Sequence, residues 1–127
     1  MTPLELTDDT FDEVVAGVAM PVLVDFTASW CPPCRLMDPI LRALAAEHGG
    51  RLLVASVDVD RNPALVRRFA VMSMPTFALF VDGVEQRRLV GARGKGQLEK
   101  EIAEVLALTG MEAFPSCPSP ALRSRTR

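Results

Sequence analysis

Apolar side chains recur along this chain at two spacings, one typical of buried strands and the other typical of helices. Nearly continuous apolar runs at residues 21–27 and 51–58 predict strands that are buried on both faces. Between them, apolar residues at helical spacing predict a long helix over residues 34–48, followed by a glycine pair that ends it. Pro39 lies inside this helix, so we expect a kink there.

Cap and turn residues between the apolar runs complete the predicted order of elements. Asn62 followed by Pro63 is typical of a helix cap and a first helical residue, and Asp82–Gly83 is typical of a tight hairpin turn. Pro21 disfavours a helical residue before it, so a helix that precedes it should stop at Met20. The other expected elements are an edge strand at 4–6, cap residues at 7–10 for the helix that stops at Met20, a helix at 63–69, strands at 76–81 and 86–90, and a helix at 97–108.

This order predicts the α/β class, with a central mixed β-sheet flanked by helices on both faces. Strands that are separated by helices pair in parallel, whereas the hairpin joins one antiparallel pair. From residue 109 the composition changes to Pro, Ser and Arg, and the apolar period stops. We therefore expect a domain over residues 1–108 and a flexible tail over residues 109–127.

Composition and charge exclude several classes of function. A length of 127 residues, with 49% hydrophobic and 24% charged residues, is typical of one globular domain. The formal net charge of −2 offers no basic surface to nucleic acid or to an anionic membrane. The amino end lacks a secretory signal, and the longest apolar run, residues 14–24, is shorter than the ~20 residues that span a bilayer. We therefore expect a cytoplasmic protein, and we expect a monomer.

Two cysteines, Cys31 and Cys34, stand between the first long strand and the long helix. Cys-x-x-Cys at such a junction is typical of a dithiol–disulfide redox site. Helical spacing brings the two sulfur atoms to one side, and the positive end of the helix dipole favours a thiolate at Cys31. Pro32 and Pro33 fit a first helical turn, but each removes an N–H group that would stabilise this thiolate. The N–H of Cys34 remains the nearest donor.

Asp25 interrupts an otherwise apolar run, and the residues alone leave two interpretations open. If the side chain is buried, desolvation raises the pKa of its carboxyl group toward neutrality, and the group is able to exchange a proton with Cys34. Alternatively, strand alternation points Asp25 to solvent and leaves its apolar neighbours on the buried face.

A zinc site is the main alternative chemistry. The side chains of a type that zinc binds are Cys31, Cys34, His48 and Cys117. The two prolines remove the N–H groups that a zinc knuckle needs, His48 lies about four turns along the helix, and Cys117 lies in the tail. We therefore expect no metal, a solvated His48 near the helix C-terminus and a spare thiol at Cys117.

Several stretches of the chain together resemble the thioredoxin family. The matching residues are Leu-Thr-Asp-Asp-Thr-Phe at 6–11, Val-Asp-Phe at 24–26, Trp-Cys-x-Pro-Cys at 30–34, Pro-Ile-Leu at 39–41, Asp-Val-Asp-Arg-Asn-Pro at 58–63, Met-Pro-Thr at 74–76, Gly-Ala at 91–92 and Lys-Gly-Gln-Leu at 95–98. The match runs from residue 4 to about residue 108 in order and spacing. The resemblance implies the thioredoxin fold and a protein-disulfide oxidoreductase, which reduces target proteins through a mixed disulfide.

The resemblance also implies a role for each site residue. Cys31 would be the attacking thiol, Cys34 the resolving thiol, and Asp25 a buried acid or base beneath Cys34. Pro75 would follow a cis peptide bond and face the dithiol, and the backbone of Met74 would pair with an extended target peptide. The expected target-binding residues are Trp30, Val59, Ser73, Met74, Pro75, Gly91 and Ala92, with Val90 beside them. The implied partners are disulfide-containing proteins and a flavin-containing thioredoxin reductase, since the chain itself carries no flavin or nicotinamide fingerprint and needs no cofactor.

Three positions depart from the family's usual pattern. Pro32 replaces the usual glycine, and Pro-Pro between the cysteines also resembles tryparedoxins and some membrane-tethered reductases, so the redox potential stays open. Thr27 replaces an aromatic residue beside Trp30. Ser56 replaces a lysine, which should leave the pKa of the Asp25 carboxyl group higher still. The alternatives are a related oxidoreductase with a shifted potential, tryparedoxin-like or disulfide-forming, and a redox-inert interaction module, against which the intact cysteines argue.

Replacing Pro32 by glycine restores one backbone N–H group near Cys31. We expect Pro32→Gly to lower the pKa of the Cys31 thiol relative to the wild type, because the added donor stabilises the thiolate. Titration of both reduced proteins by thiolate absorbance measures the difference. An unchanged thiol pKa would refute the role assigned to Pro32.

Overall fold

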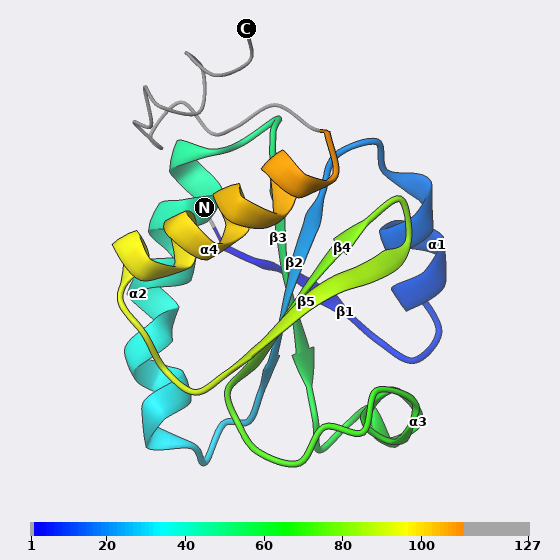
Figure 1. Cartoon of the computed structure of the whole chain (residues 1–127). Helices are drawn as coiled ribbons and strands as arrows, with labels where there is room; N and C mark the ends of the chain where they lie inside the picture. Colours follow the sequence, from blue (N-terminus) through cyan, green and yellow to red (C-terminus); the bar gives the residue numbers. More distant parts are fainter. Residues whose placement is uncertain (1, 111–127) are drawn as a thin grey trace, which may run out of the picture.

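The computed structural model describes residues 2–110 of the chain. Within this part, five strands form one sheet in the order β1-β3-β2-β4-β5, and four helices cover it (Figure 1). The strands are β1 (Leu4–Leu6), β2 (Val22–Thr27), β3 (Leu53–Asp58), β4 (Thr76–Val81) and β5 (Val84–Val90). The helices are α1 (Phe11–Gly17), α2 (Pro32–Glu47), α3 (Pro63–Arg68) and α4 (Lys95–Leu108). Most of the expected tail, including Cys117, lies outside the described residues.

The strand pairings confirm the predicted mixed sheet. β1 and β2 each pair in parallel with β3, and β4 lies antiparallel to both β2 and β5. In the turn between β4 and β5, φ is 52° at Asp82 and 79° at Gly83. A tight hairpin turn requires this left-handed conformation, which explains the Asp-Gly pair.

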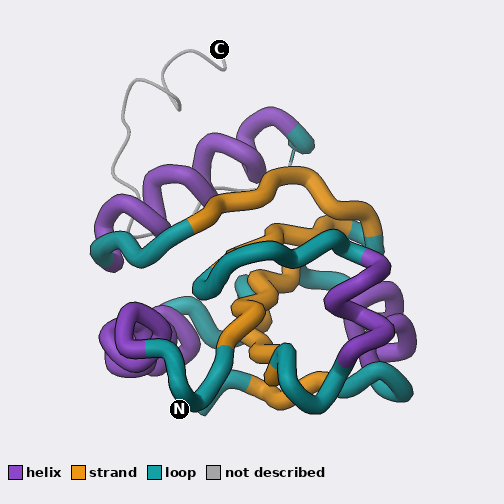
Figure 2. The backbone as a smooth tube through the Cα atoms, turned by 90° about the horizontal axis from the view of Figure 1, so that it is seen from below, coloured by secondary structure: helices purple, strands orange, loops and turns teal. Residues whose placement is uncertain are grey.

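Helices cover both faces of the sheet, as predicted (Figure 2). α2 and α4 pack on one face, over a core that includes Leu23, Met37 and Ile102. α1 and α3 pack on the other face, over a core that includes Phe11 and Val24. Successive residues of β2 therefore point into opposite cores, as a strand period of two requires. This alternation places the side chain that follows Val24 on the face that α2 and α4 cover.

Some element boundaries differ from the predicted ones. α1 ends at Gly17 and not at Met20, because Val18 already takes the extended conformation (φ −96°, ψ 149°) and packs against the core. α2 begins at Pro32, two residues earlier than predicted, since a helix accepts proline at its first positions. It continues through Pro39 without interruption. The other element ends agree with the predictions within two residues.

His48 is buried, so the prediction of a solvated histidine is wrong. Its side chain is 1% exposed, and its Nε2 lies 2.8 Å from Oε2 of Glu99 on α4. The reason is tertiary: α4 packs against α2 and brings Glu99 against a histidine that the isolated helix would leave in water.

The start of α3 receives its cap from a residue far away in the sequence. Asn62 occupies the N-cap position, but its side chain makes no capping hydrogen bond, contrary to the prediction. Its amide group instead donates to the Asp58 carbonyl (2.9 Å) and accepts from the Asp8 N–H (2.8 Å). The Asp8 carboxylate in turn accepts from the backbone N–H groups of Leu65 (3.0 Å) and Ala64 (3.4 Å). Asn62 therefore docks the loop before α1, and the docked loop caps α3.

Removal of this cap should destabilise the protein. We expect Asp8→Ala to lower the free energy of unfolding by about 1 kcal/mol, the usual contribution of an N-cap side chain. Urea unfolding measures the change. Asp9→Ala is the matched control, because the Asp9 side chain is exposed and bonds to no described residue. Equal effects of the two substitutions would contradict the capping role of Asp8.

Candidate active site

The cysteine pair lies where the central strand passes into the longest helix. β2 ends at Thr27, and Cys31 takes the N-cap position of α2 in an extended conformation. Pro32 and Pro33 form the first helical positions, so Cys34 falls within the first turn. The two cysteines form a disulfide with their Cα atoms 5.3 Å apart. The predicted dithiol–disulfide pair is therefore present at a helix N-terminus.

Cys31 has one backbone N–H donor and is otherwise surrounded by apolar groups and a carbonyl oxygen. Its Sγ accepts the backbone N–H of Cys34 at 3.3 Å, the donor that the sequence predicts. The carbonyl oxygen of Met74 lies 3.7 Å from the same sulfur. The side chains of Cys31 and Cys34 are only 4% and 1% exposed, and they form a small apolar cluster with Ala28, against which Val59 and Met74 pack.

Asp25 is buried, which resolves the two interpretations that the sequence leaves open. Its side chain is 2% exposed, opposite Ser56 on β3 and Phe77 on β4. Its Oδ1 has no hydrogen-bond partner among the described residues. Burial, aided by the negative charge of Asp38, raises the pKa of the Asp25 carboxyl group to about 7. At neutral pH this group is poised between its two protonation states.

Asp38 contributes to the raised pKa of Asp25, an effect that the sequence analysis does not predict. It is an exposed residue of α2, and its charge opposes ionisation of Asp25. The sequence does carry a signal for this effect, because Asp38 stands four positions after Cys34 and therefore lies on the same side of the helix. With Asp38 present and serine at position 56, the carboxyl group of Asp25 has a like charge nearby and no lysine from β3.

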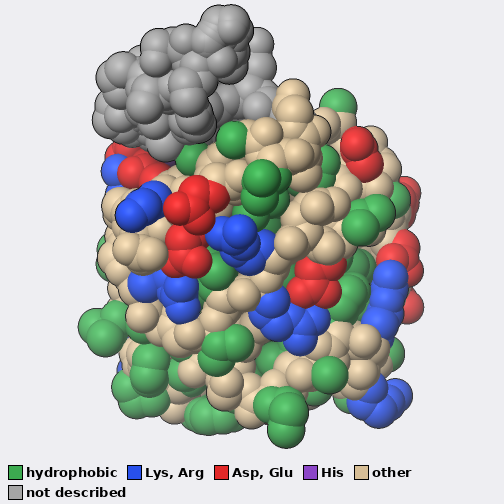
Figure 3. All heavy atoms as spheres, in the orientation of Figure 1, with side chains coloured by type: hydrophobic (Ala, Val, Ile, Leu, Met, Phe, Trp, Pro, Cys, Tyr) green, Lys and Arg blue, Asp and Glu red, His purple; other side chains and the backbone are tan. Residues whose placement is uncertain are grey.

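An exposed apolar surface adjoins the cysteines. Trp30 is 60% exposed, and its indole N–H donates to Oδ2 of Asp60 at 2.8 Å, a contact that the sequence does not predict. Other large exposed apolar side chains include Leu36, Met72 and Val90. Figure 3 shows hydrophobic side chains along the lower end of the molecule, where Figure 1 places the passage from β2 to α2.

The predicted target-binding residues come from four loops, which follow β2, β3, α3 and β5. The peptide bond between Met74 and Pro75 is cis, as the resemblance implies. Gly91 donates its N–H to the carbonyl of Pro75 at 2.8 Å, which joins the loop after β5 to this segment. Ser73 and Ala92 are both exposed. Their contact with a target stays a prediction.

Among the described residues, the cysteines share no metal-binding cluster. The one group of potential ligands there consists of Glu47, His48 and Glu99, at the far end of α2. The ammonium group of Lys95 already lies 2.7 Å from Glu47 and 3.7 Å from Glu99, so this cluster holds a cation of its own. The combination of ligands proposed for zinc does not form, because His48 contacts α4 and not the cysteines.

A cysteine pair at the start of a helix, beside a mixed sheet and a buried carboxyl group, defines a thiol–disulfide oxidoreductase. A family model described as thioredoxin matches residues 2–104. A thioredoxin of Mycolicibacterium smegmatis is 50% identical over 103 residues, which cover 80% of this chain and 92% of that protein. A thioredoxin of Mycobacterium tuberculosis is 45% identical over 81% of this chain and 89% of its own length.

The chain belongs to the thioredoxin family and is a protein-disulfide oxidoreductase. A third relative, the bifunctional thioredoxin reductase/thioredoxin of Mycobacterium leprae, is 44% identical over 81% of this chain and 22% of that protein. A search of the described helices finds none that is both long and apolar enough to cross a membrane.

The buried carboxyl group makes stability depend on pH. Its folded-state pKa of about 7 lies above the ordinary value of 3.8, so the folded protein keeps a proton that the unfolded chain releases as pH rises between these values. The contribution of Asp25 to the free energy of unfolding is therefore fully present at pH 3 and is lost as pH rises toward 7. The loss is on the order of 4 kcal/mol.

Asp25→Asn removes this titration. Between pH 4 and pH 8, we expect the wild type to lose on the order of 4 kcal/mol more unfolding free energy than the variant. Urea unfolding of both oxidised proteins across this range measures the difference, because all other titrating groups are common to the two. Parallel stability profiles would contradict the raised carboxyl pKa.

Proposed function

We propose that this protein reduces disulfide bonds in target proteins, with Cys31 as the attacking thiol and Cys34 as the resolving thiol. One observation carries the assignment: Sγ of Cys31 stands at the N-cap of α2 and accepts the N–H of Cys34. The helix N-terminus stabilises a thiolate there, and the thiolate is the nucleophile of disulfide exchange.

The reaction transfers two electrons from the dithiol to the target. The Cys31 thiolate attacks one sulfur of the target disulfide, whose S–S bond breaks and releases a target thiolate. The Cys34 thiolate then attacks Sγ of Cys31 in the mixed disulfide. The Cys31–Cys34 disulfide forms, and the second target thiolate leaves.

Asp25 takes the proton of Cys34 and returns it in the reverse reaction. A base is most effective when its pKa is close to the working pH, and the pKa of Asp25 is about 7. Pro32 and Pro33 tune the site, because neither offers an N–H group to the thiolate of Cys31.

The target docks on the apolar surface beside the cysteines. The proposed contact residues are Trp30, Val59, Ser73, Met74, Pro75, Gly91 and Ala92. An extended target segment pairs with the backbone at Met74, next to the attacking sulfur, as peptides do at a free backbone edge. The exposed indole ring of Trp30, oriented by Asp60, supports a contact role.

The oxidised protein is recycled by a thioredoxin reductase. The name of the Mycobacterium leprae relative, which joins a thioredoxin reductase and a thioredoxin, supports this partner. We further propose that the protein works as a monomer in the cytoplasm, where thiols are kept reduced. Electrons pass between sulfur atoms, so the chain itself needs no cofactor.

A related oxidoreductase with a shifted reduction potential, tryparedoxin-like or disulfide-forming, is the second candidate, because Pro-Pro stands between the cysteines. The missing N–H group at the first helical position makes the thiolate less stable, which by itself shifts the reduction potential to more negative values. A potential near about −270 mV supports the reductant, and one near about −120 mV supports a disulfide-forming protein.

Cys34→Ser should separate attack from resolution. We expect the variant to lose turnover with a protein disulfide such as insulin and to accumulate a mixed disulfide through Cys31, because no second thiol releases it. Non-reducing gel electrophoresis and mass spectrometry identify the adduct. A Cys117→Ser background excludes the tail thiol, and Cys31→Ser is the control that forms no adduct. Full turnover by Cys34→Ser would contradict the proposal.

A further inference from the structure

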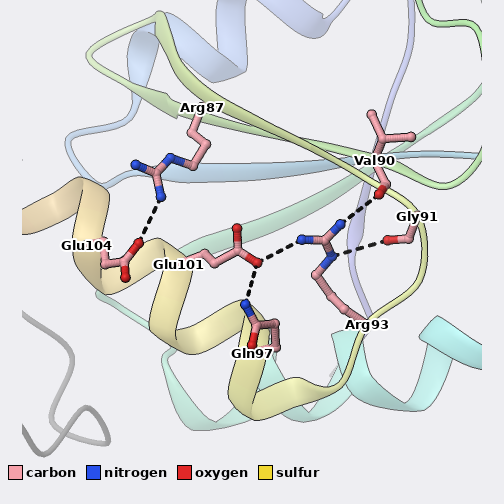
Figure 4. A network of polar contacts seen from close by, with 7 residues as sticks. All are labelled: Arg87, Val90, Gly91, Arg93, Gln97, Glu101 and Glu104. Carbon is pink, nitrogen blue, oxygen red and sulfur yellow. Dashed lines mark hydrogen bonds and ion pairs between the residues drawn. The ribbon is translucent and has the colours of Figure 1, made fainter.

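Arg93, in the loop between β5 and α4, connects three groups through one planar guanidinium (Figure 4). Its Nη1 donates to Oε2 of Glu101 on α4 at 2.7 Å. Its Nη2 donates to the Val90 carbonyl at 2.7 Å, and its Nε donates to the Gly91 carbonyl at 3.3 Å. The side chains of Arg93 and Glu101 are only 21% and 16% exposed. A half-buried guanidinium group with several N–H donors in one plane holds the backbone groups that it binds in one arrangement.

Further contacts link the loop that Arg93 holds to the cysteine pair. Gly91, whose carbonyl Arg93 holds, donates its N–H to the Pro75 carbonyl at 2.8 Å. The preceding residue, Met74, has its carbonyl oxygen 3.7 Å from Sγ of Cys31. Residues 90–91 are thus held on one side by α4 and on the other by the segment that faces the attacking sulfur.

We propose that Arg93, held by Glu101, is a positioning residue that keeps residues 90–92 in the conformation that binds the target. The proposal rests on the proposed function, because it takes Gly91 and Ala92 as part of the target-binding surface. Arg93 acts through the backbone of its neighbours and takes no part in electron transfer.

The loop needs such a restraint because its own sequence is permissive. Gly91 has a φ of 100°, and Gly94 and Gly96 follow within five residues. Glycine lets the backbone sample many conformations, so a free loop would have to be ordered each time a target binds. Two carbonyls anchored to one guanidinium remove much of that entropic cost before binding.

The carboxyl group of Glu101, which binds Arg93, stays ionised at neutral pH. Burial alone would raise the pKa of its carboxyl group, but hydrogen bonds from Gln97 and Arg93, with the charges of Arg93 and Arg87, outweigh it and hold the pKa below its ordinary value. Gln97 donates to the same Oε2 at 3.0 Å, which orients the carboxylate toward the loop.

A neighbouring ion pair provides a matched control. Arg87 on β5 donates to Oε1 of Glu104 on α4 at 3.0 Å, and so joins the same strand to the same helix (Figure 4). Among the described residues its side chain bonds to Glu104, which lies outside residues 90–92. Removal of the Arg87 side chain therefore tests what a lost link between β5 and α4 does while the three bonds of Arg93 stay in place.

Steady-state kinetics with two substrates tests the proposal. For Arg93→Met we expect the KM for insulin to rise about fivefold, because the loop at residues 90–92 must then be ordered each time a target binds. The kcat for insulin and the rate with a small disulfide, dithiobis(nitrobenzoate), should each change less than about twofold. The reduction potential should change by less than about 9 mV, which corresponds to a twofold change in the equilibrium constant. Arg87→Met should keep all four quantities, the KM included, within these limits. Arg93→Lys keeps the charge but not the fork, so its KM should lie between those of the wild type and Arg93→Met.

Amide hydrogen exchange gives a second and independent measurement. In Arg93→Met the Gly91 amide should exchange about fivefold faster or more, because its bond to Pro75 loses support. The Val59 amide, which donates to Thr27 at 2.9 Å nearby, should keep its rate. If Arg93→Met does not fold, Glu101→Gln is measured in its place, with the same direction expected in KM and in exchange.

Several outcomes overturn the proposal. An unchanged insulin KM, equal changes for Arg93→Met and Arg87→Met, or equal losses with insulin and the small disulfide would each do so. Failure of the proposed function is a different result, since the wild type would then not reduce insulin at all.

Discussion

The central strand β2 constrains everything around the cysteine pair. It is hydrogen-bonded to β3 on one side and β4 on the other, and its successive residues point into two different cores. Because a shift of one residue would exchange the two faces, the register decides which core receives the only carboxylate of the strand. In the observed register Asp25 lies on the side of α2, and the end of the same strand leads to Cys31. One strand therefore positions both the acid and the dithiol.

Burial of this carboxyl group has opposite effects on stability and on chemistry. An acid whose pKa is raised to about 7 destabilises the folded protein at neutral pH. The same shift makes it a base suited to a thiol at that pH. Asp38 strengthens the shift, and Ser56 does nothing to offset it. The chain thus keeps a destabilising group at the place where we propose that a proton is exchanged with Cys34, as is common at functional sites.

The two sides of the site are ordered by different means. The side of the cysteines is rigid because it belongs to a helix and to the buried cluster around Ala28. The opposite side consists of loop backbone at Met74 and Gly91, which takes its order from individual hydrogen bonds. The bonds of Arg93 to the carbonyls of Val90 and Gly91 are among them.

Local sequence predicts most of what depends on neighbouring residues. The apolar periods of β2 and α2, the Asp82–Gly83 turn and the Cys-x-x-Cys spacing are set within a few positions, and the structure agrees with each. The resemblance to the thioredoxin family added the cis bond before Pro75 and the burial of Asp25, which alternation alone left open. Both are properties of the whole fold that a short stretch does not specify.

Only the tertiary structure decides contacts between distant segments. His48 is buried because α4 covers it, Asp8 caps a helix more than fifty positions away, and Arg93 joins the loop after β5 to α4. Each depends on how elements pack, and a residue's own neighbours carry no signal for it. The sequence by itself therefore determined the strand, the helix and the cysteines between them. The packing of the elements decided which charged groups surround that pair, because charge interactions act through space and not along the chain.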